Sequence, residues 1–469
     1  MRPSRSSTAS SSGHEAAPGP AAAMRLRRWL KPGMGVKRWL LLIFLGLLLL
    51  ALAGAHVIRN VTKDLQPGGA FQAAIDLVTL QFLPFPLRGL IVGGVGTALV
   101  LIGAWRLAEA LTRPLRLDEE TPLADVIYQK RFLARGPRIV AIGGGTGLST
   151  LLRGLKEHSS NITAIVTVAD DGGSSGALRE ELGIPPVGDI RNCIAALADA
   201  EPLMSELLGY RFPGGHRIDG GPVETQPGGL GGHPVGNLLL AAMTALEGGD
   251  FEEGVRRMNR VLAVRGQVVP ASATPINLVA RTRDGVTVSG QSTIMRTPGI
   301  ERVWIEPSDV RASDDALAAI AEAEIVVLGP GSLYTSVLPV LLIPAIRKAI
   351  ADAPGVRVYA CNVATQLGET EGYDLADHVD ALLAHTQPDL VDLVLANDRF
   401  DGDDAPWPSG AVQPRWPPAV DPAPHLATDA IASLDDPHHH DPGRLALAIL
   451  RAFEREGPAV RRERTARTA

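Results

Sequence analysis

Two glycine-rich turns, each after a short apolar run, lie one strand-helix unit apart in this chain. The first is Gly143-Gly-Gly-Thr-Gly147, and the second is Asp170-Asp171-Gly-Gly-Ser174-Ser175-Gly176. In an open α/β sheet, such a turn lets backbone N–H groups at a helix start face a phosphate. The pattern predicts alternating strands and helices with a nucleotide-binding site. Ser149 is expected to cap a helix over residues 150–157.

The first turn departs from the best-known phosphate motifs. Leu148 or Thr150 occupies the last glycine position of G-x-G-x-x-G, depending on the starting glycine, and the lysine of a P-loop is missing. Phosphate binding is still favoured over a purely structural turn. A dinucleotide site with Asp170 as the ribose-binding acid is a weaker alternative, because paired aspartates before Gly-Gly-Ser-Ser suit phosphate and metal better.

Composition limits the classes of function. A net charge of -6 argues against a general nucleic-acid partner, because such proteins usually carry a basic surface. The only cysteines are Cys193 and Cys361, so neither a disulfide framework nor a cysteine metal site is indicated. This cysteine usage suits a reducing cytoplasm.

The N-terminal part predicts a membrane hairpin. Residues 1–37 are rich in Ser, Ala, Pro and Arg and are expected to be disordered. Within residues 38–106, Trp39–Ile58 and Gly89–Trp105 are the two expected spans. Basic residues flank the outer ends of this pair, which favours both ends in the cytoplasm. A cleaved signal peptide is the alternative for the first segment, although its apolar run is longer than usual.

After a linker over 107–136, residues 137–398 are predicted to form a Rossmann-like α/β domain with a mainly parallel sheet. The clearest strands are Ile139–Ile142, Ala164–Val168, Glu324–Leu328 and Val356–Cys361. A small antiparallel insertion is expected from Val268–Ala271, Asn277–Thr282 and Val286–Gly290, with a turn at Asp284-Gly285. No regular element is expected over 213–233. Residues 399–469 form a Pro/Asp-rich segment with a helix over 442–456.

Two further motifs at predicted helix starts also indicate anion binding. Gly188-Asp189-Ile-Arg191-Asn192 comes at a predicted helix start, where Asp189 is either a plain cap or, with Asp171 across a cleft, a ligand of Mg²⁺ on a diphosphate. Arg191 would neutralise phosphate or pair with a carboxylate. Gly329-Pro-Gly331-Ser332-Leu-Tyr-Thr335-Ser336 is a second strand-to-helix anion turn.

Neutral and imidazole side chains give less specific signals. Asn237, and Asn362 with Thr365 and Gln366, suit hydrogen bonding to a base or sugar, or else only turn the backbone. His438–His440, beside Asp436 and Asp441, are interpreted as a solvated turn rather than a metal site. Neither a Ser-His-Asp nucleophile elbow nor zinc-ligand spacing is present in the sequence.

At these motifs the chain resembles the YvcK/CofD-like family over about residues 137–385. Six stretches carry the resemblance: Gly143–Ser149, Asp170–Gly176, Gly188–Asn192, Gly236-Asn237-Leu238, Gly329–Ser336 and Asn362–Thr370. The resemblance implies a Rossmann-like core with these motifs around a nucleotide cleft. The amino-acid sequence around residues 170–175 and 362–370 is closer to the gluconeogenesis-factor branch than to the CofD branch.

The two branches imply different functions. The first implies a regulator that binds a UDP-sugar such as UDP-N-acetylglucosamine and supports gluconeogenic growth, cell shape and cell-wall precursor supply. The second implies an Mg²⁺-dependent transferase that moves 2-phospho-L-lactate from a GDP-activated donor to a deazaflavin. A third class, a membrane adaptor with a vestigial site, is also open. The predicted spans depart from the family pattern, since most members look soluble. The long loop 213–230 is a second departure, because it expands the segment before Gly236-Asn237.

The leading expectation is a membrane-tethered, cytoplasm-facing nucleotide-sugar regulator. Its expected partners are the nucleotide sugar, the membrane, a second copy of the chain and a cell-envelope protein, without nucleic acid. Asp171 and Asp189 are the expected metal pair, and the catalytic pair if the protein is a transferase. The expected ligand contacts are Gly143, Gly144, Gly145, Thr146, Gly147, Asp170, Ser174, Ser175, Arg191, Asn192, Asn237, Gly331, Ser332, Thr335, Ser336, Asn362, Thr365 and Gln366.

Overall fold

The computed structural model of the protein describes residues 36–61, 84–112, 133–212, 230–400 and 407–468. It divides into two compact units, Met1–Tyr128 and Gln129–Ala469, each considered by itself. The predictions of a disordered N-terminus, of most of the 107–136 linker and of an irregular 213–233 loop fall largely outside the described residues.

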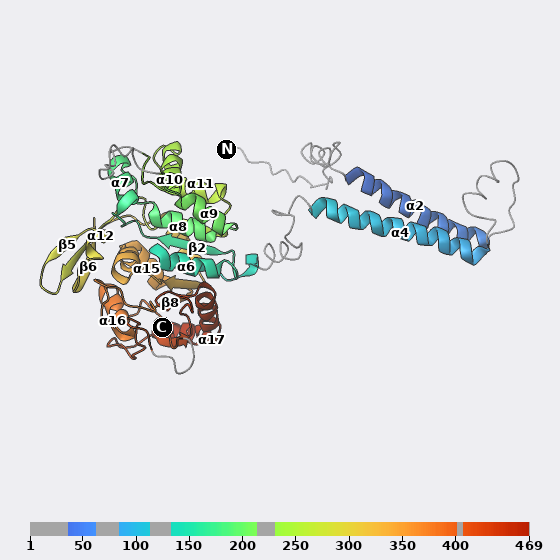
Figure 1. Ribbon diagram of the computed structural model, residues 1–469. Helices are drawn as coiled ribbons and strands as arrows, with labels where there is room; N and C mark the ends of the chain where they lie inside the picture. The colour runs from blue at the N-terminus through green and yellow to red at the C-terminus, as the bar shows by residue number, and fades with distance from the viewer. Residues whose placement is uncertain (1–35, 62–83, 113–132, 213–229, 401–406, 469) are drawn as a thin grey trace, which may run out of the picture. The chain divides into compact units, whose positions relative to one another are not determined.

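The N-terminal unit contains two helices side by side, α2 (Val36–Val61) and α4 (Phe85–Thr112) (Figure 1). They cover the two predicted apolar segments. Glycines permit their close contact: a Cβ atom at Gly46 would lie 2.9 Å from the carbonyl oxygen of Gly96. Leu41 and Leu90 point outward and are 70% and 73% exposed.

The length and apolar composition of each helix can be compared with what a membrane span requires. In the described part of the chain, no helix taken singly is both long and apolar enough to cross a membrane. Residues 333–341 together with 344–352 pass by length and composition, but the two helices are bent by 78° at their junction.

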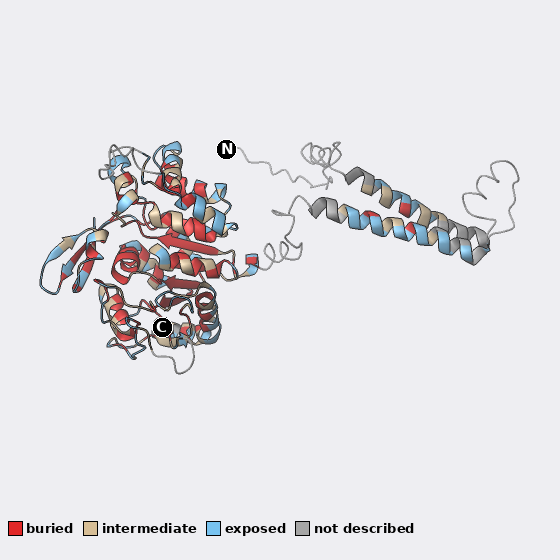
Figure 2. Ribbon diagram, in the orientation of Figure 1, coloured by how far each residue is buried: buried red, intermediate tan, exposed pale blue. Residues whose placement is uncertain are grey.

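The second unit is built on a seven-stranded sheet in the order β10-β9-β8-β7-β1-β2-β3. Every neighbouring pair in it is parallel. Most of its strands are apolar and wholly buried, as expected for a sheet covered on both faces (Figure 2). The strands are β1 (Ile139–Gly143), β2 (Ile162–Val166), β3 (Gln267–Pro270), β7 (Ile325–Leu328), β8 (Val356–Ala360), β9 (Leu393–Asn397) and β10 (His425–Asp429).

The strand order contains one reversal of direction. From β1 the chain adds β2 and then β3 on one side, and from β7 it adds β8, β9 and β10 on the other. Strands β1 and β7 are therefore the neighbours at which the winding changes direction, as in a Rossmann fold. Ligands in such sheets bind outside the carboxyl ends of these two strands. The predicted fold class is confirmed for this unit.

Helices cover the sheet in two groups. Helices α6, α8 and α17 are linked by direct contacts, and α13, α14 and α15 form the other contacting group. The remaining helices lie outside these two groups. The helices are α6 (Gly145–Leu155), α7 (Gly173–Leu182), α8 (Gly188–Leu197), α9 (Glu201–Gly209), α10 (Val235–Leu246), α11 (Phe251–Val261), α12 (Gln291–Ile294), α13 (Asp314–Glu322), α14 (Leu338–Leu341), α15 (Pro344–Asp352), α16 (Leu375–His385) and α17 (Pro442–Thr468), with short turns η2 (Leu133–Arg135) and η3 (Leu333–Val337).

The small antiparallel sheet differs in one strand from the prediction. It contains β4 (Asn277–Thr282), β5 (Thr287–Ser289) and β6 (Ile300–Glu306), and β4 and β5 are joined through Asp284-Gly285 as predicted. The predicted strand Val268–Ala271 instead corresponds to β3, which pairs in parallel with β2. Its apolar run suits a buried sheet edge better than a half-exposed hairpin.

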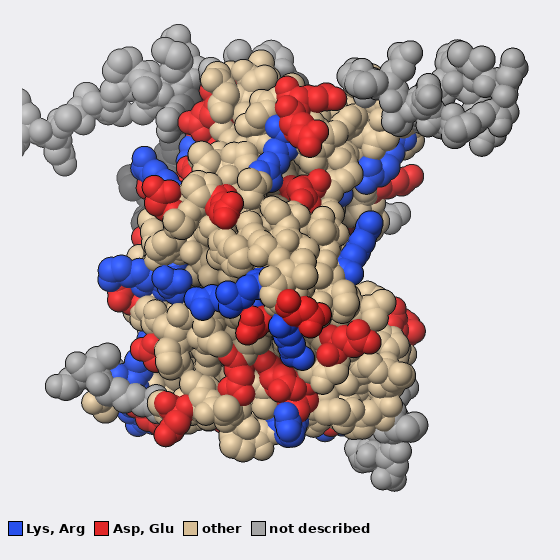
Figure 3. Space-filling view, turned by 90° about the vertical axis from the view of Figure 1, so that its left-hand side faces the viewer, with Lys and Arg blue, Asp and Glu red and all other residues tan. Residues whose placement is uncertain are grey.

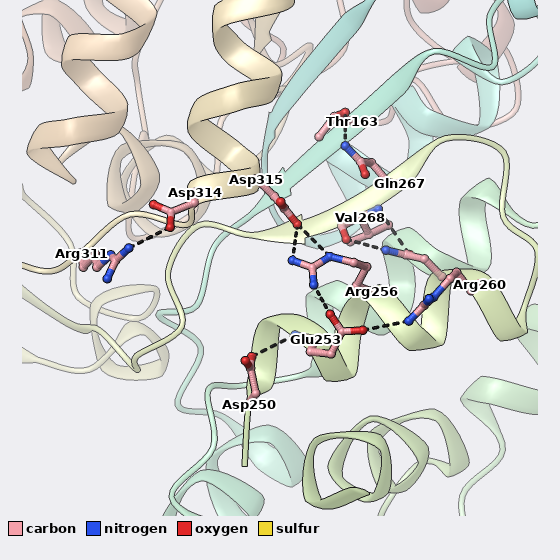
Figure 4. Close-up of polar contacts among 11 residues, drawn as sticks. Thr163, Asp250, Glu253, Arg256, Arg260, Gln267, Val268, Arg311, Asp314 and Asp315 are labelled. Atoms are coloured by element: carbon pink, nitrogen blue, oxygen red, sulfur yellow. Dashed lines mark hydrogen bonds and ion pairs between the residues drawn. The ribbon is translucent and has the colours of Figure 1, made fainter. Parts of the chain in front are cut away.

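The free edge of β3 is closed by a side chain rather than by another strand. Asn259 on α11 donates from Nδ2 to the carbonyl oxygen of Val268 at 2.8 Å and accepts from its N–H at 3.3 Å. Beside it, Arg256 donates to Asp315 at 2.8 and 3.1 Å and so joins α11 to α13 (Figure 4). The two Asn259 bonds satisfy edge groups of β3 that would otherwise be open to another chain.

The C-terminal segment completes the fold. The predicted domain end at residue 398 lies between β9 and β10, which are paired strands of one sheet. The predicted helix over 442–456 is the first part of α17, which continues to Thr468. Gly154 of α6 lies so close to the carbonyl group of Pro442 that a side chain at Gly154 would collide with it. The tail is therefore built into the same unit.

Charged side chains of both signs are dispersed over the face on which β5 and β6 lie, among a larger area of other residues (Figure 3). Several Lys and Arg side chains form a short row on one side of this face. Arg281 on β4 and Arg302 on β6 are among the exposed basic residues of this small sheet. Arg281 forms an ion pair with Glu301 at 3.3 Å.

Candidate functional site

A cleft of about 640 Å³ lies at the carboxyl ends of β1, β2, β7 and β8, where the strand order reverses. This is the position that the topology favours for a ligand. The predicted site residues that line it are Gly144, Gly145, Thr146, Gly147, Asp170, Asp189, Gly331, Ser332, Thr335, Ser336, Asn362, Thr365 and Gln366. A second hollow, of about 450 Å³, lies at the amino ends of β1 and β2 and contains none of these motifs.

The first glycine turn starts its helix earlier than predicted. Helix α6 begins at Gly145, with Gly144 in extended conformation as its N-cap. Gly145 has φ +64°, which favours glycine, and its N–H is one of the donors left open at a helix start. Ser149 is not the cap: it lies inside α6, and its hydroxyl donates to the Gly145 carbonyl at 3.0 Å.

The second anion turn packs directly against the first. It runs from Gly329 to Ser332 and leads into η3 and α14. A Cβ atom at Gly147 would lie 2.7 Å from the Pro330 carbonyl oxygen and 2.9 Å from the Gly331 N, so a side chain there would force the turns apart. The two glycine-rich segments are therefore held together by backbone contact, and both line one cleft.

The amide residues after β8 have structural partners in this turn. Asn362 accepts from the Gly331 N–H at 3.1 Å and donates to the Gly331 carbonyl at 2.9 Å. Gln366 donates from Nε2 to the Ser332 hydroxyl at 2.8 Å. Both therefore shape the anion turn as well as lining the cleft. The alternative interpretation of Asn362 as a backbone-turning residue thus has direct support.

Thr335 is also committed to a partner within the protein. It is fully buried, and its hydroxyl donates to Glu369 Oε1 at 2.7 Å. Burial raises the pKa of Glu369, and hydrogen bonds from Thr335 and Tyr334 oppose that rise. The Thr335 carbonyl accepts from Gln291 Nε2 at 2.9 Å. Ser332 and Ser336 are thus better placed than Thr335 to offer a hydroxyl to a ligand.

The structure brings Asp170, rather than Asp171, beside Asp189. Asp170 and Asp189 both line the cleft, whereas Asp171 accepts from the Ser292 N–H at 2.8 Å and supports α12. Asp189 lies in the first turn of α8, partly buried, with no side-chain cap bond at that helix start. The predicted pairing of Asp171 with Asp189 is therefore replaced by Asp170 with Asp189.

Burial and the nearby charge of Asp170 disfavour the ionised form of the Asp189 side chain relative to its protonated form. Desolvation raises its pKa to about 6, and the negative charge of Asp170 adds to this, while the Gly145 N–H and Arg191 act in the opposite direction. The two carboxylates offer the oxygen ligands that Mg²⁺ takes together with substrate phosphates. Over the described residues, no cluster of three or more His, Cys, Asp or Glu side chains suited to a metal is present.

Five predicted contacts form a neighbouring polar network instead of lining the cleft. Arg191 donates to Asn237 Oδ1 at 3.0 Å, and Asn237 donates to the Ser174 hydroxyl at 3.0 Å. Ser175 accepts from the Gly188 N–H at 3.1 Å. Asn192, paired with Arg191, is the fifth member. The group fixes α7, α8 and α10 relative to one another.

Gly143 is the other predicted contact that does not line the cleft. It is the last residue of β1, fully enclosed, so its backbone serves the sheet rather than a ligand. Cys193 and Cys361 are both buried and unpaired. Burial raises the pKa of the Cys361 thiol to about 12, and it raises that of Cys193 as well. Neither thiol is therefore suited to act as a nucleophile.

Several cleft residues escaped the sequence analysis. Thr150 belongs to the first turn, but Gln291 and Met295 come from α12, and Val363 and Ala364 follow β8. The most distant are His438, His439 and His440: His438 and His439 are solvent-exposed, as the interpretation of a solvated turn expects, but the turn also lines the cleft. Their three consecutive imidazoles beside Asp436 were the available signal.

Comparison with known proteins identifies the family of this chain. The family model for 2-phospho-L-lactate transferase CofD matches residues 139–407, more than half of the chain. The chain belongs to the YvcK/CofD-like family. A putative gluconeogenesis factor from a Nostoc species is 46% identical over 375 residues, which cover 79% of this chain and 78% of that protein.

Other similar proteins match a smaller share of the chain. The gluconeogenesis factor of Bacillus subtilis is 49% identical over 266 residues, or 56% of this chain and 80% of that protein. A crystal structure of a UPF0052-family protein from Bacillus halodurans is 43% identical, with a TM-score of 0.58. The match covers 67% of this chain and 99% of that chain.

The Nostoc relative extends the similarity towards the N-terminus. Its alignment covers 79% of this chain, which is longer than the whole unit Gln129–Ala469. The shared region therefore reaches into the N-terminal unit that contains α2 and α4.

Proposed function

We propose that this YvcK/CofD-like protein is a regulator that binds a UDP-sugar, such as UDP-N-acetylglucosamine, and adjusts cell-wall precursor supply and cell shape to gluconeogenic growth. The observation that carries the proposal is the pair of helix-start anion turns, Gly144–Gly147 and Gly331–Ser332, facing one cleft at the switch point. The relatives named gluconeogenesis factors support the regulatory role.

The cleft suits a nucleotide sugar in size and in polarity. Its volume of about 640 Å³ is within the range of small-molecule sites. The diphosphate would lie over the N–H groups of the two turns, because helix starts favour anions. Thr365, Gln366 and the carbonyl groups near Asn362 would then hydrogen-bond the base or the sugar.

Calorimetric titration of the purified full-length protein tests this proposal. UDP-N-acetylglucosamine and GDP are each titrated with and without Mg²⁺. The variant Thr146→Glu places a negative charge at the exposed first turn of α6, where it suits the helix dipole but repels a phosphate. We expect at least a tenfold weaker UDP-sugar affinity in Thr146→Glu and no change in the control Thr287→Glu on exposed β5. Absence of UDP-sugar binding at millimolar concentration would refute the proposal.

A second candidate is an Mg²⁺-dependent transferase of the 2-phospho-L-lactate type, with a GDP-activated donor and a deazaflavin acceptor. The observation that favours it is the proximity of Asp170 and Asp189, two carboxylates that would hold Mg²⁺ against the ligand phosphates. A bound Mg²⁺ would neutralise developing phosphate charge. This candidate predicts Mg²⁺-dependent preference for GDP, and loss of turnover in Asp189→Asn with the fold retained. Unchanged turnover in that variant would exclude it.

We further propose that α2 and α4 anchor the protein in the membrane with both ends cytoplasmic. The outward-facing Leu41 and Leu90, together with glycines at the contact, are typical of helix pairs in lipid. Separation of cell extracts into membrane and soluble fractions tests the anchor. If the protein stays soluble after gentle lysis, the anchor is refuted.

A homodimer and a cell-envelope protein partner complete the proposal. Sedimentation velocity of the purified protein tests the first, and crosslinking in cells, with the helices present or deleted, tests the second.

A further inference from the structure

The cleft has an unusual charge balance for a site that would receive a diphosphate. Two carboxylates, Asp170 and Asp189, line it, and neither Lys nor Arg is among its described lining residues. Among the described lining residues, the side chains able to carry a positive charge are those of His438, His439 and His440. A dianionic ligand thus has few cationic partners apart from the helix starts and a metal ion.

The histidines belong to a turn, residues 436–440, that is fixed to the end of β8. The His440 Nε2 lies 3.1 Å from the Cys361 carbonyl oxygen. Desolvation lowers the pKa of His440 to about 4, so the ring is neutral at physiological pH and donates its Nε2 proton to that carbonyl. Since Asn362 follows Cys361 and brackets Gly331, His440 holds the turn next to the second anion turn.

Further bonds make the turn a rigid part of the cleft wall. The Ser433 N–H donates to the His439 carbonyl at 2.8 Å, and residues Ala432 and His440 form a β-bridge. His438 Nε2 lies 3.0 Å from the Ser409 carbonyl oxygen. The adjacent Gly410 carbonyl accepts from the backbone N–H of the cleft residue Thr365 at 2.8 Å.

His439 has one nitrogen engaged and one available. Its Nδ1 lies 2.7 Å from Asp436 Oδ2, which makes Nδ1 the protonated donor, and its Nε2 has no hydrogen-bond partner among the described residues. With Nδ1 directed at a carboxylate, a phosphate oxygen at Nε2 would be bonded by a ring that carries a proton on each nitrogen. This arrangement is suited to a contact with a phosphate oxygen.

We propose that the histidine turn 436–440 is a phosphate-contacting wall of the ligand site, with His439 as the contact residue and His440 as its positioning residue. The proposal rests on the proposed function, since it assigns a contact within the same nucleotide-sugar cleft. It lies beyond residue 407, where the match to the family model ends. The ligand class that this wall recognises is a nucleoside diphosphate or its sugar derivative.

Three variants of the full-length protein test the contact by calorimetry with UDP-N-acetylglucosamine. His439→Gln keeps a polar side chain but removes the imidazole, and His439→Lys supplies a cation at the same position. His425→Gln is the matched control, because His425 lies on β10, bonded to Glu463 and outside this cleft. Melting temperatures, which should agree between the two His439 variants because the side chain is exposed, report any loss of folding.

We expect His439→Gln to weaken binding about tenfold, His439→Lys to restore at least half of that loss on a logarithmic scale, and His425→Gln to match the wild type. Titration with UDP in place of the sugar nucleotide should give the same ratios, because the contact is with phosphate. Wild-type affinity in His439→Gln, or equal losses in the Gln and Lys variants, would overturn the histidine contact while leaving the proposed function intact. Failure of the wild type to bind either ligand would instead refute the proposed function and, with it, this inference.

Discussion

Replacing Asp189 by Asn should stabilise the protein at neutral pH in the absence of a divalent cation. The folded state raises the pKa of this carboxyl from 3.8 to about 6, because the group is desolvated and faces Asp170. Each pKa unit corresponds to about 1.4 kcal/mol, so the upper limit of the penalty is about 3 kcal/mol. Since the side chain is partly exposed, solvent screening reduces the expected gain to about 1–2 kcal/mol.

The pH dependence follows from the direction of this shift. The folded state binds the Asp189 proton more tightly than the unfolded state does, so deprotonation costs folded stability as the pH rises. The penalty is absent below about pH 4, grows between pH 4 and 6 and is complete above pH 6. Asp189→Asn should therefore gain stability above pH 6 and lose that advantage as the pH falls towards 4.

Thermal denaturation of both proteins in EDTA between pH 4.5 and 8 measures the effect. A gain of 1–2 kcal/mol corresponds to about 1–3 °C for a unit of this size. Asp284→Asn, in the exposed β4–β5 turn, is the matched control and should show no such pH-dependent gain. If Mg²⁺ binds at Asp170 and Asp189, it should stabilise the wild type more than Asp189→Asn. A variant that is less stable than the wild type at pH 7.5 in EDTA would refute the desolvation argument.

Three further substitutions test the architecture of the site. Gly147→Ala should separate the two anion turns and weaken ligand binding at least tenfold, whereas Gly209→Ala, which has open space around it, should not. Asp392→Ala should lower the free energy of unfolding by about 3–5 kcal/mol, because it removes the carboxylate that pairs with the buried Arg357 guanidinium; a loss below 1 kcal/mol would contradict that reasoning. Asn259→Ala should cost about 1–3 kcal/mol by exposing unpaired edge groups of β3, as measured by urea denaturation, and unchanged stability would show that water replaces the side chain.

Much of the cleft could be predicted because its residues follow buried strands. The turns after β1 and β7 were found from apolar runs that end in glycine, and parallel strands bring their carboxyl ends to one edge. The resemblance to the YvcK/CofD-like family also arose from these local motifs. The misassigned β3 is the opposite case, because a four-residue apolar strand carries no information about which sheet it joins.

The roles of adjacent polar residues were harder to predict. Asp170 and Asp171 follow the same strand and have the same chemistry, but successive side chains point in different directions. Which of them faces the cleft depends on how the chain leaves β2 and where α12 lies. Likewise, the cap of α6 depends on the conformation of Gly144 and Gly145, not on the hydroxyl of Ser149.

The α/β class, the two apolar N-terminal segments and the anion turns can be predicted from the residues alone, because periodicity and glycine placement act over a few residues. The folded unit is needed to show which carboxylate lies beside Asp189, that β10 and α17 complete the sheet unit, and that His438–His440 line the cleft. These features depend on contacts between segments far apart in the chain, such as His440 with Cys361. Such contacts are set by the packing of the whole unit, so a local pattern such as three consecutive histidines does not show which distant segment it will meet.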